Sequence, residues 1–208
     1  MNEPVAVAVL AKAPVAGLAK TRLIPALGAD GAALLQERLI ERAAATAAAA
    51  GIGPVTVWAT PDETHPIFRA LRGRGAALAR QGDGDLGRRM LAALAAAHGP
   101  CLVIGTDCPA LAADHLRAAA NILRDGADVV IVPAEDGGYV LIGMRKPAPA
   151  LFTDMRWSTP GVMAETRRRL RQLGLSWEEP VTLWDLDRPE DLARLAEVGL
   201  DDLIPSQG

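Results

Sequence analysis

Short apolar runs alternate along this chain with segments of helix-forming composition, and this alternation restricts the fold more than any other feature. The runs of strand length cover residues 4–11, 54–60, 76–80, 101–105, 127–133, 139–144 and 180–185. The segments that favour helices cover residues 30–50, 64–72, 86–98, 112–124, 160–173 and 189–197. Continuous runs of Val, Ala, Leu and Ile are typical of strands buried on both faces, and repeated strand–helix units build parallel sheets covered by helices. The sequence therefore predicts an α/β fold, a three-layer sandwich with a mainly parallel sheet.

The chain carries no sign of a boundary between domains. It has 208 residues without an internal repeat, a low-complexity linker or an abrupt change of composition, so residues 1–208 are expected to form a single domain. The gap between the runs 127–133 and 139–144 is short, which leaves open whether these strands are neighbours or run antiparallel. Asp30 is the expected cap of the helix over residues 30–50.

Composition excludes several classes of partner. The 22 Lys and Arg residues against 25 Asp and Glu residues give a net charge of −3, and aromatic residues make up 3% of the chain. Such a chain has neither a basic field for a nucleic-acid backbone nor rings for stacking on bases. The apolar runs are too short to span a bilayer and the first lacks a basic leader, so we expect a cytoplasmic protein with no nucleic-acid or membrane partner. Cys101 and Cys108 are too few to form a disulfide framework, and no nearby residues complete a four-ligand metal site with them. The sequence leaves undecided whether the protein forms a homodimer.

The loop after the first apolar run concentrates positive charge. Of the 22 basic residues only three are lysines, and Lys12 and Lys20 both fall in this loop together with Arg22. Thr21 adds a hydroxyl, and small residues such as Gly17 let the backbone approach an anion. In open α/β sheets, ligands bind beyond the carboxyl ends of the strands. The loop is therefore interpreted as a phosphate site, the alternative being a solvated loop with ordinary surface charges.

Carboxylates follow two of the apolar runs. Asp107 lies two residues after the run 101–105, Asp185 ends the run 180–185, and Asp187 lies two residues beyond it. Carboxylate oxygens at strand ends are suitable ligands for Mg²⁺. The alternative for Asp107 is a turn cap, and Asp187 has the position of a helix N-cap before Pro189. The pattern alone does not separate Asp185 from Asp187.

Two further segments have loop character. Residues 136–139 hold paired glycines, which permit close approach of a ligand or form a hairpin turn. Residues 157–159 precede a predicted helix, where Ser and Thr are first of all capping residues. The run Gly82–Gly87 fits the dinucleotide pattern G-x-G-x-x-G, but Asp83 and Asp85 would place carboxylates where a pyrophosphate must bind.

Short motifs then occur in a fixed order from about residue 4 to about residue 197. They are Lys12-x-Pro14-x-x-Gly17-x-x-Lys20-Thr21-Arg22-Leu23, Gly-Asp-Leu-Gly at 84–87, Gly-Thr-Asp-Cys-Pro at 105–109, Glu-Asp-Gly-Gly-Tyr at 135–139, Trp-Ser-Thr at 157–159 and Asp-Leu-Asp-x-Pro-Glu-Asp-Leu at 185–192. Through these motifs the chain resembles the radical-SAM and selenodomain-associated transferase family. That glycosyltransferase-like family is similar to 2-phospho-L-lactate guanylyltransferase and to molybdenum-cofactor guanylyltransferase. The resemblance implies the GT-A, or nucleotide-diphospho-sugar transferase, fold.

The resemblance also implies roles for the charged residues. It places Lys20 and Arg22 on the outer phosphates of a nucleotide, as catalytic residues together with Asp107. It makes Asp107 a ligand of Mg²⁺ or Mn²⁺, with Asp187 as the second metal ligand and Asp185 as the alternative to it.

The remaining motifs are assigned to the nucleotide and the acceptor in the same way. The resemblance places Gly84, Leu86 and Gly87 against the base or the sugar, and Lys12, Gly17 and Thr21 of the first loop are likewise assigned to nucleotide binding. The residues that it assigns to the acceptor pocket are Asp136, Gly137, Gly138, Tyr139, Trp157, Ser158 and Thr159.

The expected activity is a Mg²⁺- or Mn²⁺-dependent nucleotidyl transfer from a nucleoside triphosphate to a small, phosphorylated acceptor, with release of pyrophosphate. Several cations in one phosphate loop favour a triphosphate over a diphosphate. The alternative is a glycosyltransferase that uses a nucleotide-diphospho-sugar donor. A second alternative is an NAD-dependent oxidoreductase that uses the Gly82–Gly87 loop, and a third is a nucleotide-binding regulator without catalysis.

Overall fold

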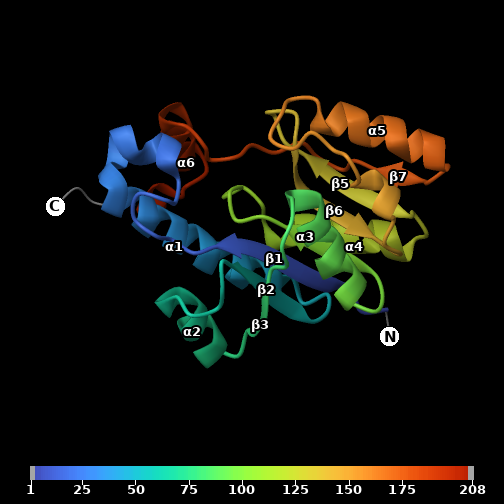
Figure 1. Ribbon diagram of the computed structural model, residues 1–208, viewed down its shortest axis with the longest axis horizontal. Helices are drawn as coiled ribbons and strands as arrows, with labels where there is room; N and C mark the ends of the chain where they lie inside the picture. The colour runs from blue at the N-terminus through green and yellow to red at the C-terminus, as the bar shows by residue number, and fades with distance from the viewer. Residues whose placement is uncertain (1–2, 206–208) are drawn as a thin grey trace.

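The apolar runs form the strands of a seven-stranded sheet in the computed structural model, which describes residues 3–205 (Figure 1). The strands are β1 (Ala6–Lys12), β2 (Val55–Thr60), β3 (Ala77–Arg80), β4 (Cys101–Ile104), β5 (Val129–Pro133), β6 (Tyr139–Met144) and β7 (Trp177–Glu178). Their order is β3-β2-β1-β4-β6-β5-β7, and only β6 runs antiparallel to its neighbours among the described strands. The expected mainly parallel sheet is confirmed. β5 and β6 are both neighbours and antiparallel, with Ile131 opposite Ile142.

Helices cover both faces of the sheet. They are α1 (Ile24–Ala50), α2 (Pro66–Gly73), α3 (Leu86–Ala96), α4 (Ala113–Arg124), α5 (Val162–Leu173) and α6 (Leu192–Glu197), with 3-10 turns η1 (Thr21–Leu23), η2 (Pro149–Leu151), η3 (Pro189–Asp191) and η4 (Asp201–Leu203). Val7 and Val9 of β1 belong to a core with α1, α2 and α4, whereas Ala8 belongs to a core with α3 and α5. Because successive side chains of a strand point to opposite faces, β1 is buried on both sides, and the three-layer sandwich is confirmed.

The strand expected over residues 180–185 is wrong. The edge strand β7 pairs with β5 only over Trp177–Glu178, and the later segment keeps a single bridge between Leu183 and Ala134. Pro180 has no amide hydrogen and therefore cannot donate to a strand ladder, which explains the interruption. Beyond it the chain leaves the sheet and crosses the molecule to α6, as the orange-red segment of Figure 1 shows.

The first helix begins earlier than expected. Helical structure starts at Ile24 with Pro25 in its first turn, and Gly28, whose φ of 71° is not helical, separates this short segment from the long helix over the expected residues. Proline suits the first turn because its missing N–H needs no partner there, and glycine adopts a positive φ without strain. Asp30 lies inside this helix and does not cap its start.

A third group of buried side chains joins the start of α1 to the C-terminal segment. Its members are Leu23, Leu35, Leu39, Trp184, Leu186, Leu195 and Leu203. In Figure 1 the blue start of α1 accordingly lies beside the red α6. This packing brings the cationic residues that precede Leu23 close to the aspartates on either side of Leu186. β1 and β4 are parallel neighbours, so the loops that follow them leave from the same edge of the sheet.

Within residues 3–205, no helix combines the length and the apolar character that a membrane crossing needs. The cytoplasmic location stays a prediction.

Candidate active site

Lys20 joins the loop after β1 to the loop after β4. Its ammonium lies 2.6 Å from Asp107 Oδ1 and also donates to the backbone carbonyl of Leu186, at 2.6 Å. The Lys20 side chain is only 5% exposed although its partner Asp107 is 57% exposed. The backbone of Lys20 is left-handed, with φ 45°, just before the turn η1. The residue is therefore held inward by the fold, instead of extending from a solvated loop.

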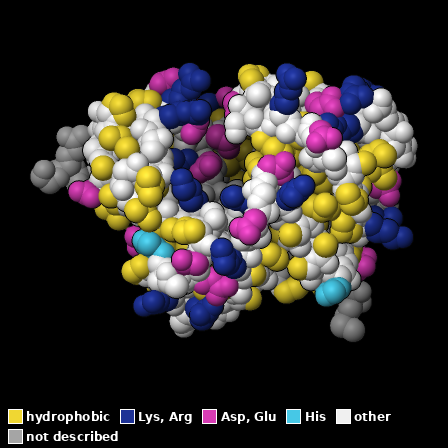
Figure 2. All heavy atoms as spheres, in the orientation of Figure 1, with side chains coloured by type: hydrophobic (Ala, Val, Ile, Leu, Met, Phe, Trp, Pro, Cys, Tyr) yellow, Lys and Arg dark blue, Asp and Glu magenta, His cyan; other side chains and the backbone are white. Residues whose placement is uncertain are grey.

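A second ion pair links the same loop to the C-terminal segment. Arg22 pairs with the Asp187 carboxylate, and the Leu186 amide donates to the Asp107 carbonyl at 2.8 Å. The loops after β1 and β4 and the segment after β7 thus meet at one place. Figure 2 shows acidic and basic side chains gathered in a hollow of this face, between the parts of the molecule that carry α6 and α5.

Asp185 is half-buried near the carboxylates of Asp107, Asp136 and Asp187. Burial raises the pKa of its carboxyl to about 7, and the nearby charges of Asp107 and Asp136 act in the same direction. The Lys20 ammonium opposes this shift. The segment alternates in burial, because Trp184 and Leu186 are buried in the third core group.

Asp187 does not cap the last helix. The backbone amides of Asp187 and Arg188 both donate to Asp191 Oδ2, at 2.9 and 2.8 Å. Asp191, the third residue of the turn η3, thus reaches back to the amide of the N-cap residue Arg188, while the Asp187 carboxylate pairs with Arg22.

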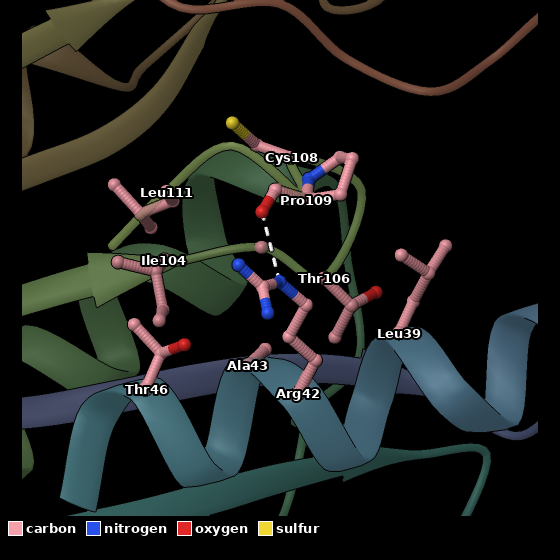
Figure 3. A pocket seen from close by; sticks show the side chains of 10 residues that line it. Leu39, Arg42, Ala43, Thr46, Ile104, Thr106, Cys108, Pro109 and Leu111 are labelled. Atoms are coloured by element: carbon pink, nitrogen blue, oxygen red, sulfur yellow. Dashed lines mark hydrogen bonds between the residues drawn. The ribbon is translucent and has the colours of Figure 1, made fainter. Parts of the chain in front are cut away.

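Two side chains of helix α1 form hydrogen bonds with the loop that carries Asp107. The buried Gln36 side chain donates to Thr106 Oγ1 at 3.1 Å, and Arg42 Nε donates to the Pro109 carbonyl at 2.8 Å. Figure 3 shows Arg42 reaching from α1 to Pro109, beside a small cavity of about 10 Å³. Sequence reasoning missed both contacts. The available signal is that Gln36 interrupts the buried apolar face of α1.

The remaining residues of the first loop shape the loop itself. Lys12 Nζ donates to the Leu18 carbonyl at 2.8 Å, and Gly17 has a φ of 79° at the exposed turn. Thr21 is exposed at the start of η1. Lys12 therefore fixes the loop, while Lys20 and Arg22 reach the aspartates.

The two segments assigned to the acceptor pocket lie against each other. A Cβ atom on Gly137 would come within 2.2 Å of the Pro160 carbonyl oxygen, so this close approach requires a glycine. Asp136 Oδ1 accepts from the Gly138 amide at 2.8 Å, and the rings of Tyr139 and Trp157 meet edge to face with 6.4 Å between their centres.

Neither Ser158 nor Thr159 caps α5. The N-cap of α5 is Gly161, and the Thr159 hydroxyl donates to the Arg156 carbonyl at 2.9 Å instead. Ser158 has a φ of 59°, which is uncommon for a residue with a side chain and occurs preferentially at functional sites.

The glycine run after β3 belongs to the same neighbourhood. A Cβ on Gly87 would lie 2.6 Å from the Trp157 ring, while Gly84 has a φ of 107° beneath the Arg88 side chain. Leu86 is exposed. The Asp85 carboxylate accepts from the Arg88 amide at 2.9 Å and so caps α3. A dinucleotide pyrophosphate would need that helix N-terminus, and the capping carboxylate therefore argues against the oxidoreductase alternative.

With this geometry in place, comparison with known proteins identifies the family. The chain belongs to the family described as "Uncharacterized protein conserved in bacteria (DUF2064)". The family model matches residues 28–159. The narrower association with radical-SAM and selenodomain genes stays a prediction.

A curated relative of this DUF2064 protein is 3-phospho-D-glycerate guanylyltransferase of Phenylobacterium zucineum (strain HLK1). The two are 34% identical over 190 residues, which cover 86% of this chain and 84% of the relative. Among solved structures, a candidate nucleotide-diphospho-sugar transferase from Desulfovibrio desulfuricans G20 superposes with a TM-score of 0.82 and 29% identity, covering 90% of this chain and 84% of that one.

Glucosyl-3-phosphoglycerate synthase of Mycobacterium tuberculosis, solved with Mn²⁺ and UDP, superposes with a TM-score of 0.56 and 14% identity, over 99% of this chain and 82% of that one. At that identity the likeness shows the fold alone. The expected GT-A fold is confirmed, and so is the expected class of protein, a nucleotide-dependent transferase.

The residues at this edge of the sheet fit a divalent metal ion. Asp107, Asp185 and Asp187 offer carboxylate oxygens, the ligands that Mg²⁺ and Mn²⁺ prefer. Burial is the main cause of the raised pKa of Asp185, and the nearby carboxylates add to it. Among residues 3–205, no three His, Cys, Asp or Glu side chains already converge as a metal site. The cations that contact Asp107 and Asp187 are Lys20 and Arg22.

Proposed function

We propose that this DUF2064 protein transfers a nucleotidyl group from a nucleoside triphosphate to a small phosphorylated acceptor and releases pyrophosphate. The observation that carries the proposal is the meeting of Lys20 and Arg22 with Asp107 and Asp187 at the carboxyl edge of the sheet. Phosphoryl chemistry needs cations for the phosphate oxygens and carboxylates for a metal ion at one place.

We propose GTP as the nucleotide and 3-phospho-D-glycerate as the acceptor, because the 34% identical relative is named for that pair. Mg²⁺ or Mn²⁺ would be held by Asp107 and by Asp187 or Asp185, and would supply positive charge to the phosphate oxygens.

The chain's own residues would then divide the work. Lys20 and Arg22 would hold the β- and γ-phosphates, since charge-assisted hydrogen bonds to phosphate are the strongest available to a loop. As pyrophosphate departs, negative charge grows on the oxygens that these side chains contact, so the contacts strengthen in the transition state. The segments 136–139 and 157–159 would line the acceptor pocket, and the run 84–87 would contact the base or sugar.

The reaction balances without an added base. A new bond forms between an oxygen of the acceptor phosphate and the α-phosphorus. The bond between the α-phosphorus and the oxygen that bridges to the β-phosphorus breaks, and its electron pair leaves with pyrophosphate. A phosphate dianion carries no proton on the attacking oxygen, so no residue is required to remove one.

Glycosyl transfer is the second candidate, favoured by the solved neighbour described as a nucleotide-diphospho-sugar transferase. In that reaction a sugar leaves a nucleoside diphosphate, and no pyrophosphate forms.

Turnover products separate the two candidates. The protein is incubated with Mg²⁺, GTP and 3-phospho-D-glycerate, and pyrophosphate release and product mass are measured; parallel samples contain ATP, CTP or UTP. We expect pyrophosphate and an acceptor enlarged by one nucleoside monophosphate. The proposal is wrong if none of the triphosphates yields pyrophosphate while a nucleotide-diphospho-sugar yields free nucleoside diphosphate. Asp107→Asn is the matched control, and it should lose turnover while its circular dichroism stays unchanged.

A further inference from the structure

Lys20 and Arg22, the two cations expected on the outer phosphates, are each paired with an expected metal-binding carboxylate in the free protein. Lys20 contacts Asp107 and Arg22 contacts Asp187, so one short loop neutralises the carboxylates of two separate segments. The arrangement is reinforced from the backbone, because Lys20 also donates to the Leu186 carbonyl, which lies next to Asp187.

The ammonium of Lys20 is enclosed where it meets these oxygens. Its side chain is 5% exposed, and both of its oxygen partners lie at 2.6 Å. An ammonium has three N–H donors, and the structure gives it a carboxylate and a carbonyl as acceptors, which are the same oxygen types that a hard divalent cation takes. Asp107, by contrast, is 57% exposed, so its carboxylate can be reached from the hollow side.

Free metal and Lys20 therefore compete for the same site. A divalent ion that bound Asp107 beside the enclosed ammonium would experience strong like-charge repulsion at close range. Moving Lys20 away without giving it another partner would leave its charge poorly compensated. A triphosphate removes both obstacles, because its oxygens offer Lys20 and Arg22 new anionic partners while it brings its own metal ion.

We infer that Lys20 and Arg22 occupy the metal's place in the free protein, so that the site takes the metal–nucleoside triphosphate complex as one ligand and binds free metal weakly. The inference rests on the proposed function for the identity of the nucleotide, and it concerns the order in which the same site is filled.

Mn²⁺ binding tests this directly without turnover. The water-proton relaxation rate rises when Mn²⁺ moves from solution, or from free nucleotide, onto a protein. In wild-type protein we expect weak Mn²⁺ binding alone, and binding at least tenfold tighter when a non-hydrolysable GTP analogue is present. Lys20→Met should tighten binding of Mn²⁺ alone at least tenfold. Lys146→Met is the matched control, since this exposed lysine follows the end of β6 and has no place in the site, and it should leave Mn²⁺ binding as in wild type.

Further variants keep the test decisive. Lys20→Gln serves if Lys20→Met does not fold, and Asp107→Asn combined with either variant should abolish the gained Mn²⁺ site. The inference is overturned if wild type binds Mn²⁺ as tightly without nucleotide as with it, or if neither Lys20 variant gains Mn²⁺ affinity. Failure of the proposed function is seen elsewhere, as the absence of pyrophosphate release with every triphosphate, and does not alter the Mn²⁺ titration of the free protein.

Discussion

Asp185 and Asp187 are close in the chain but have different surroundings. Asp187 is 47% exposed and is neutralised by Arg22. Asp185 lies among negative charges, and burial raises the pKa of its carboxyl to about 7. A carboxylate kept in such a place costs stability unless a cation joins it, which is typical of functional residues. We therefore expect Asp185 to have a role in binding the metal, next to Asp187.

Asp185→Asn should separate function from stability. Removing a charge that lies among other carboxylates should leave the melting temperature of the metal-free protein at pH 8 unchanged or raised. Turnover should fall at least about a hundredfold, which corresponds to about 2.7 kcal/mol of transition-state stabilisation. Thermal unfolding and steady-state kinetics measure both effects. Asp114→Asn, at the 90% exposed end of an ion pair on α4, is the control and should change neither. A variant that unfolds more easily yet keeps its turnover would mean that Asp185 is structural.

Among the helices, α1 contacts both the loop that carries Lys20 and Arg22 and the loop that carries Asp107. Its first turn follows the loop of Lys20 and Arg22, and its middle contacts the Asp107 loop through Gln36 and Arg42. The bend at Gly28 lies between these two sets of contacts.

Gln36→Leu should weaken the binding of the metal–nucleotide complex about tenfold, or about 1.4 kcal/mol, because the Asp107 loop loses its buried tie. It should also lower the unfolding free energy by about 1–3 kcal/mol, since the Thr106 hydroxyl loses its partner. Adding Thr106→Val makes both partners apolar and should recover much of the stability without recovering affinity. Calorimetric titration and denaturant unfolding measure the two quantities. Glu41→Gln, which alters an α1 contact with Arg74 instead, should leave nucleotide affinity unchanged.

The contact between α5 and the edge strand gives a pH-dependent prediction. Hydrogen bonds from Arg167, at 2.9 and 2.6 Å, lower the pKa of Glu179, and Trp177 adds another bond. A lowered folded-state pKa contributes stability above the unfolded value, and that contribution is lost as pH falls through the folded value. Glu179→Gln should therefore lower the unfolding free energy at pH 7 by about 0.5–1 kcal/mol. The difference between variant and wild type should be smaller at pH 3 than at pH 7 in thermal unfolding. An equal difference at both pH values would contradict this account.

The elements could be predicted wherever local pattern decides them. The buried runs became β1, β2, β4, β5 and β6 because continuous Val, Ile and Leu fill both faces of a sheet. The run 180–185 is also apolar, but it forms only one bridge to the sheet. Pro180 cannot donate to a strand ladder, and Trp184 packs in the third core group instead. The hydrogen bond from Gln36 to Thr106 spans 70 residues, so local sequence shows a polar residue on the buried face of α1 but does not indicate its partner.

For the molecule as a whole, the location of the site followed from topology. Loops after parallel neighbours meet at the carboxyl edge of a sheet, so Lys20 and Asp107 could be expected near each other. The burial of Lys20 could not be foreseen, because it depends on the C-terminal segment returning across the molecule to offer the Leu186 carbonyl. This return also joins Arg22 to Asp187 and completes the site from three distant parts of the chain.

A ligand that fills such a site should stabilise the whole molecule. At about 100 times its dissociation constant, a Mg²⁺–GTP complex should add about 2.7 kcal/mol to the unfolding free energy. For a chain of this length, that corresponds to a rise in melting temperature of about 5–10 °C. Mg²⁺ alone should have little effect, since Lys20 and Arg22 already neutralise Asp107 and Asp187. GTP with excess EDTA should also change the melting temperature little, because the carboxylates repel phosphates that carry no metal ion.

GDP-sugars with Mg²⁺ should leave the melting temperature unchanged in the same thermal-shift measurements. A large shift with GDP-sugars and none with triphosphates would instead identify a glycosyltransferase.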